Sequence, residues 1–294
     1  MANLKEIRQR VSTVRSTRQI TSAMKMVSAA KLKKAQDAII RIRPYEAALH
    51  HILDVITLSS AEAESSPLTV QRTPDRVLLV VITANRGLCG GFNLNVAREA
   101  IDIINSDYPG KIKSGQLDLL VIGKKGAEII RSKGYGQWPV ESHLVEKPSY
   151  LASEELAAGL INQFLAGQYD RIELIYNQFK NAATQILIRE QFLPVEPVEP
   201  PANTRGNAPF YIFEPDLNHL ATALLPKALK IRFHKAILDS QAAEHGARMT
   251  AMHQATDNAT EMIRGLTLEY NKARQAAITG ELIEIVSGAE ALKS

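Results

Sequence analysis

The feature that most constrains this 294-residue chain is the lack of helix-breaking residues at both of its ends. Residues 1–43 contain neither glycine nor proline, and no proline occurs in the 68 residues after Pro226. Because helices end or kink at such residues, each end is predicted to form one long helix. At 1.5 Å per residue, the two helices would extend about 65 Å and about 90–100 Å.

Apolar residues recur at steps of three and four along both predicted helices. The N-terminal set is Leu4, Ile7, Val11 and Val14, followed by Ile20, Met24 and Val27. The six-residue step between the two groups indicates a stutter. The C-terminal set is unbroken over Met252, Ala255, Ala259, Ile263, Leu266, Tyr270, Ala273 and Ala277. Such stripes need to be buried, and an antiparallel coiled coil of the two ends would do so.

Between these helices the sequence predicts an α/β domain. RVLLVVITA (76–84) and LDLLVIG (117–123) are apolar runs typical of strands buried on both faces. Helices are expected at 93–106, 127–134 and 153–167, the last capped by Ser153, and a β-hairpin at 172–179 and 183–193. The predicted fold class is α/β, with a Rossmann-like globular domain inserted into a long antiparallel coiled coil.

The domain limits follow from composition. The predicted domains are an N-terminal coiled-coil helix at 1–58, a globular α/β domain at 75–213 and a C-terminal coiled-coil helix at 216–294. Residues 59–74 and the proline-rich stretch 194–209 are expected to connect them.

Charge is distributed unevenly along the chain. Residues 1–43 hold eleven Lys or Arg against Glu6 and Asp37, a net +9 in a chain of net charge +4. Such a basic arm favours an acidic partner, whether nucleic acid, anionic lipid or a protein surface. No run of 18 apolar residues and no apolar leader is present, so neither a membrane span nor a secretory signal is expected.

The glycine-rich RGLCGGFN (86–93) has the place of a nucleotide-binding loop but not its residues. A phosphate loop needs Lys and then Ser or Thr after its last glycine, whereas Phe92 and Asn93 follow Gly91. A tight strand-to-helix turn with Cys89 as a packed thiol is therefore expected. The seven histidines lack metal-ligand spacing, so no catalytic residue, cofactor or metal is predicted. An α/β enzyme using this loop stays a weaker hypothesis.

Four segments resemble the ATP synthase gamma-subunit family, the rotor shaft of the F-type enzyme. KEIRQRVSTVRSTRQITSAMKMVSAAKL (5–32) is similar to its N-terminal helix. ARMTAMHQATDNATEMI (247–263) and YNKARQAAITGELIEIVSGAEAL (270–292) are similar to its C-terminal helix. RGLCGGFN is similar to the loop after the first strand of its middle domain. The resemblance covers the whole chain in order, with residues 194–209 the least matched.

This resemblance implies a rotor that is not itself catalytic. The coiled coil would lie inside a ring of three alpha and three beta subunits, and the globular domain would contact the epsilon subunit and the c-subunit ring. Proton-driven rotation of the c ring would then drive ATP synthesis in beta, and ATP hydrolysis would drive rotation in the opposite direction. The implied location is the cytoplasmic face of the inner membrane, peripheral and attached through partners only.

The resemblance also implies particular contacts with the catalytic ring. The implied residues are Met24, Lys25, Met26, Arg86, Arg248, Gln275 and Thr279. The first three match a stretch near an acidic lever loop of beta, where a long cation and flexible thioethers suit a contact that forms and breaks repeatedly. The C-terminal three match polar positions that engage a loop of beta during rotation, and Arg86 matches a contact with the base of the ring.

Besides the weaker enzyme hypothesis, the residues alone leave open a second class of function, a basic coiled-coil protein that binds nucleic acid. Phosphate contacts by the N-terminal arm would make such binding steeply salt-dependent. An aromatic content of only 5% and the lack of a groove-binding motif argue against it.

Overall fold

The computed structural model describes residues 4–59, 66–195, 214 and 217–291. The chain divides into two compact units, one made of residues 1–28 with 248–294 and the other of residues 29–247. Helix α1 (Leu4–Ser59) and helix α6 (Leu217–Ala291) contribute to both units. The two predicted long helices are confirmed, and Pro44 lies within α1 without ending it.

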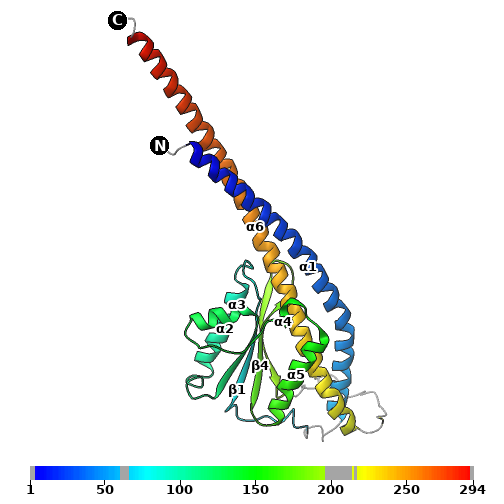
Figure 1. The fold of residues 1–294 in the computed structure, drawn as a ribbon. Helices are drawn as coiled ribbons and strands as arrows, with labels where there is room; N and C mark the ends of the chain where they lie inside the picture. Colours follow the sequence, from blue (N-terminus) through cyan, green and yellow to red (C-terminus); the bar gives the residue numbers. More distant parts are fainter. Residues whose placement is uncertain (1–3, 60–65, 196–213, 215–216, 292–294) are drawn as a thin grey trace. The chain divides into compact units, whose positions relative to one another are not determined.

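In the first unit, the start of α1 packs against the C-terminal half of α6 in antiparallel orientation (Figure 1). The Thr256 hydroxyl of α6 donates a hydrogen bond to the Thr21 hydroxyl of α1 at 2.8 Å. Ile7 and Ser28 of α1 and Ala259 of α6 are also buried. The last turns of α6 continue beyond the start of α1 (Figure 1), so only one helix is present there.

The predicted stripe of α1 is wrong at Ile20 and Val27. Buried or half-buried positions continue along the contact without a stutter at Leu4, Ile7, Val11, Val14, Arg18, Thr21, Lys25 and Ser28, and Met24 is half-buried as predicted. Ile20 and Val27, expected inside, are 60% and 57% exposed. Thr21 and Ser28 replace them in the contact because small side chains allow two helices to approach closely. The predicted α6 stripe is buried or half-buried except for Ala277, which is exposed.

The second unit is built on a five-stranded sheet in the order β3-β2-β1-β4-β5. The strands are β1 (Val77–Ile82), β2 (Leu117–Ile122), β3 (Val140–Glu141), β4 (Arg171–Phe179) and β5 (Gln185–Leu193). All neighbouring pairs are parallel except β4 and β5, which form the predicted hairpin. Every side chain of β1 is buried, as its continuous apolar run predicts.

Helices cover both faces of this sheet (Figure 1). Helices α2 (Phe92–Ser106) and α3 (Lys124–Ser132) pack on one face, against the β1 side chains of Val77, Leu79 and Val81. Helix α4 (His143–Glu146), helix α5 (Tyr150–Leu165) and the part of α6 around Phe233 pack on the other. Helix α5 starts earlier than predicted, since Ser149 is its cap and Ser153 is buried inside it.

Two glycines allow α3 to approach the end of β1. A Cβ on Gly123 would lie 2.3 Å from the Thr83 carbonyl oxygen, and one on Gly126 would lie 2.4 Å from the Thr83 hydroxyl. The Gly126 amide instead donates to that hydroxyl at 3.1 Å. The segment GKKG (123–126) therefore allows the backbone at the start of α3 to pack closely against the end of β1.

Residues 60–65 and 196–213 lie outside the described residues. The predicted connector 194–209 falls largely there, as does the end of the predicted globular domain. The predicted domain limits at 58, 75, 213 and 216 therefore stay predictions.

Candidate partner-binding surfaces

Met24, Lys25 and Met26 occupy consecutive positions of α1 in the first unit. Met26 is 65% exposed, while Met24 and Lys25 are half-buried. Successive helical residues point about 100° apart, so the three side chains cannot share one face. Met26 belongs to the outward face with Ile20 and Val27, whereas Lys25 lies at the edge of the contact with α6.

Arg248, Gln275 and Thr279 all lie on α6 but do not form one site. Arg248 is buried, whereas Gln275 and Thr279 are exposed. At 1.5 Å per residue, Arg248 and Gln275 are about 40 Å apart along the helix. Gln275 and Thr279 are one turn apart, and the Thr279 hydroxyl donates to the Gln275 carbonyl at 2.9 Å.

The end of α6 exposes large apolar side chains that were not predicted as contact residues. They are Ile278, Leu282, Ile283, Ile285 and Val286, each at least half exposed. Large exposed apolar groups of this kind mark surfaces that a partner covers. The sequence ELIEIV already indicates that some of these side chains are exposed. Its apolar residues are distributed around the helix rather than along one stripe.

Arg86 lies in the second unit, on the loop that joins β1 to α2. The Asn93 side chain organises this loop: it accepts the Ala84 amide at 2.8 Å and donates to the Arg86 carbonyl at 3.3 Å. Cys89 is buried and packs with Phe92, as predicted. Leu88 has a positive φ of 61° and is 63% exposed, so the loop presents an apolar side chain beside Arg86.

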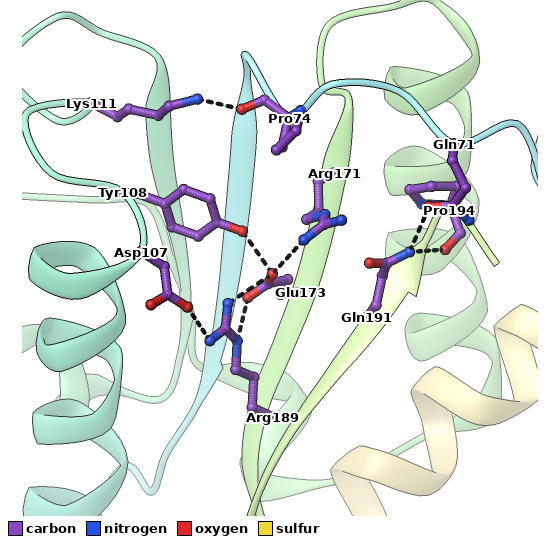
Figure 2. Close-up of polar contacts among 10 residues, drawn as sticks. All are labelled: Gln71, Pro74, Asp107, Tyr108, Lys111, Arg171, Glu173, Arg189, Gln191 and Pro194. Atoms are coloured by element: carbon purple, nitrogen blue, oxygen red, sulfur yellow. Dashed lines mark hydrogen bonds and ion pairs between the residues drawn. The ribbon is translucent and has the colours of Figure 1, made fainter. Parts of the chain in front are cut away.

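A buried carboxylate fixes the β4–β5 hairpin to the end of α2 (Figure 2). Glu173 is 3% exposed and accepts from the Arg189 guanidinium at 2.8 and 3.1 Å and from the Tyr108 hydroxyl at 2.8 Å. Arg189 also pairs with Asp107. Hydrogen bonds from Ser106 and Arg189 lower the pKa of Asp107, while burial and the Glu173 carboxylate raise the pKa of Tyr108. This network braces the fold rather than forming an open site.

A second buried carboxylate lies on α6 within the same unit. Asp239 is buried, and this burial raises its pKa to about 6. The positive charges of Lys235 and Arg43 oppose this shift, and the negative charges of Glu46 and Glu190 add to it. Lys235 itself donates to Glu46 of α1, which ties α1 to α6 in the second unit.

Neither a metal cluster nor a membrane span is found in the described part of the chain. Residues 4–59, 66–195 and 217–291 hold no group of three or more His, Cys, Asp or Glu placed to hold a metal ion. In the same residues, no helix is apolar over a stretch long enough to cross a bilayer.

Two long paired helices carrying an inserted α/β domain define the class of stalk subunits found in rotary ATP synthases. The ATP synthase family model matches residues 3–292. The chain is 52% identical to the ATP synthase gamma chain of Flavobacterium johnsoniae, covering 99% of both chains, and 46% identical to that of Geobacter sp. strain M21, covering 100% of both. It belongs to the ATP synthase gamma-chain family, and its function is that of the gamma subunit in the central stalk.

Solved structures share the fold. The match to the rotor of Euglena gracilis mitochondrial ATP synthase covers 94% of this chain and 98% of that chain, with a TM-score of 0.64 at 20% identity. The match to the central stalk and c ring of the Tetrahymena thermophila mitochondrial enzyme covers 80% of this chain and 99% of that chain, with a TM-score of 0.60 at 24% identity. At such identities these structures support the fold alone.

Proposed function

We propose that this gamma subunit turns inside a ring of alpha and beta subunits and transmits torque without catalysing a reaction itself. Its α/β unit would contact the epsilon subunit and the c-subunit ring, and rotation of the c ring would be coupled to ATP synthesis or hydrolysis in beta. The complex would place it at the cytoplasmic face of the inner membrane, held there by its partners. The family supports the stalk role in preference to nucleic-acid binding.

One observation carries this proposal: the paired helices keep large apolar side chains on their outside. Ile20, Met26 and Val27 of α1 are each more than half exposed, although small residues such as Ala259 and Ser28 fill the contact between the helices. A soluble coiled coil places its large apolar residues inside, so this additional exposed set fits a shaft whose outer surface turns within an apolar bearing formed by other subunits.

The specific ring contacts belong to the proposal as well. Arg86, beside exposed Leu88, would meet the base of the ring. Gln275 and Thr279 would meet a beta loop near the end of α6, and Met24, Lys25, Met26 and Arg248 would meet beta further from that end.

The first experiment co-expresses the chain with its own alpha and beta subunits and measures co-purification and multisite ATPase turnover. The proposal predicts a complex whose turnover depends on this chain. If the chain fails to assemble, or assembles without changing turnover, the proposal is wrong.

A triple variant tests the exposed end of α6. Replacing Ile278, Leu282 and Ile285 by Ser should leave the free energy of unfolding of the isolated chain within about 0.5 kcal/mol, because all three side chains are exposed. In the complex the same change should make the subunit dissociate at lower denaturant concentration. Lys133→Ser, an exposed change in the α/β unit, serves as the control. Equal dissociation of the triple variant and wild type would contradict an apolar bearing at this end.

A further inference from the structure

An aspartate interrupts the apolar strand β2. Asp118 lies between Leu117 and Leu119, both of which are almost completely buried. Because side chains alternate across a strand, Asp118 shares its face of the sheet with Leu120. Its partner in register on β1 is Leu78, and both of these leucines pack in the apolar layer that α5 covers. A carboxylate in such a layer needs compensation, because burying an unpaired charge costs free energy.

The chain supplies only part of that compensation. Asp118 is half-buried and accepts a hydrogen bond from the Tyr169 hydroxyl at 2.9 Å through its Oδ2 atom. Burial raises the pKa of Tyr169 to about 12, so the phenol keeps its proton at neutral pH, although the charge of Arg76 opposes this shift. Among the described residues neither Arg76 nor another cation forms an ion pair with Asp118, and none donates to its Oδ1 atom. The carboxylate is therefore able to bind a cation from outside the chain.

A cleft of about 410 Å³ lies at this carboxylate, with Asp118 in its lining. Its size falls in the range of pockets that hold small molecules. Trp138, from the segment before β3, and Leu156 and Leu160 of α5 line the cleft as well. The Trp138 indole N–H donates to the Tyr135 carbonyl at 2.7 Å, so the polar atom of this side chain is already paired. The cleft thus combines one carboxylate with mostly apolar walls.

This combination selects one class of cation. A metal ion such as Mg²⁺ or Ca²⁺ needs several oxygen ligands, and no cluster of three or more metal-binding side chains occurs in the described ranges. A guanidinium or amidinium group is planar and offers two parallel N–H groups to the two oxygens of a carboxylate. An apolar body attached to such a group would contact the leucines and Trp138, as small-molecule sites with few polar groups require.

We propose that this cleft binds a small organic cation, whose planar guanidinium or amidinium head pairs with Asp118 and whose apolar body lies against Leu156, Leu160 and Trp138. Tyr169 holds the carboxylate in place from the other oxygen. The inference goes beyond torque transmission and is independent of it.

Trp138 is the single tryptophan of the chain, so it reports on this cleft without any substitution. We would titrate the full chain with benzamidine, an amidinium on an apolar ring, and follow Trp138 fluorescence and the one indole N–H signal in NMR spectra. We expect a saturable change with a dissociation constant below about 1 mM. Benzamide has the same shape without the charge, and methylguanidine has the charge with almost no body. Each of them should bind at least tenfold more weakly than benzamidine.

Two variants of the chain test the two halves of the site. Asp118→Asn keeps the size of the side chain but removes its charge, and it should weaken benzamidine binding at least tenfold. Asp102→Asn, a change of an exposed carboxylate on α2, is the matched control and should leave binding unchanged. Gly159 lines the cleft, and a side chain added there meets no atom within 4 Å, so Gly159→Leu should fill the cleft, preserve the fold and weaken binding at least tenfold.

Four results would each overturn the proposal: no saturable change with benzamidine, equally tight binding of benzamide, unchanged affinity of Asp118→Asn, or unchanged affinity of Gly159→Leu. The comparison of benzamidine with benzamide uses the unmodified chain, so it does not depend on how well a variant folds. None of these results bears on assembly with alpha and beta, and a failure here would leave the proposed rotor function as it stands.

Discussion

Glu173 makes more polar contacts than any other side chain of Figure 2, and it lies on β4, the strand beside the edge strand β5. Replacing it by Gln would keep its size but leave the Arg189 guanidinium without its buried anion. Because hydrogen bonds to charged groups contribute about 1.5–3 kcal/mol each, we expect Glu173→Gln to lower the free energy of unfolding by about 2–3 kcal/mol. Urea unfolding would measure this change.

Asp107→Asn provides the matched control for this prediction. It removes the other carboxylate that pairs with Arg189, but the Asp107 side chain is 40% exposed. Exposed ion pairs contribute little, so its effect should stay below about 1 kcal/mol. Equal losses in the two variants would contradict a network centred on Glu173.

Asp239 gives a prediction about pH. Its pKa rises from 3.8 to about 6 on folding, so between these values the folded chain keeps a proton that the unfolded chain releases. The free energy of unfolding should therefore fall as pH rises from about 4 to about 6 and then level off. Asp239→Asn should remove this contribution and be more stable than wild type at pH 7 by about 1–3 kcal/mol.

Chemical denaturation at pH values from about 4 to about 7 would measure the contribution of Asp239 to the free energy of unfolding. Asp102→Asn is the control because that carboxylate is exposed. A parallel pH profile for wild type and Asp239→Asn would show that Asp239 does not titrate in this range.

Little of this residue-level detail could be predicted from the sequence. Glu173 lies in IELIYNQF, a run that predicts a strand but not which strand residue meets a cation. Arg189 is adjacent to it only because β5 turns back on β4, and Tyr108 because α2 crosses the sheet.

At the scale of elements, Ala259 is the residue on which the close approach of α1 and α6 depends. It is buried and lies one turn from Thr256, which bonds to Thr21. Ala259→Trp should force the helices apart and lower the free energy of unfolding of the first unit by about 1–3 kcal/mol, the usual cost of overpacking. Asn258→Trp places the same ring on an exposed position and should be nearly neutral. Calorimetry of the isolated chain would compare them, and similar unfolding of both would mean that the seam is assigned incorrectly.

The elements themselves were largely predictable. Glycine and proline positions predicted the long helices, and apolar runs predicted β1, β2 and the hairpin, since these signals are local. The stripe of α1 was predicted wrongly at Ile20 and Val27 because apolar residues were expected to face inward. Ile20 and Val27 instead lie outside while Thr21 and Ser28 lie inside. The proposed ring of other subunits would cover that outer face.

For the whole molecule, the absence of glycine and proline from residues 1–43 and the family membership lead to one account. The helical pair is a shaft with apolar residues on its surface, and the Glu173 network stabilises the α/β unit. In the proposed function the chemistry of ATP belongs to other subunits. The residues assigned to ring contact, Met24, Lys25, Met26, Arg86, Arg248, Gln275 and Thr279, stay predictions of that account.

Single-molecule rotation tests the central claim most directly. Cys89 is the single cysteine and is buried, so Lys113→Cys would supply one exposed thiol on the α/β unit for a bead, with the alpha–beta ring fixed to a surface. The account predicts stepwise bead rotation in one direction that starts with ATP and stops without it. Complexes that hydrolyse ATP at the normal rate while the bead on this chain never rotates would contradict it.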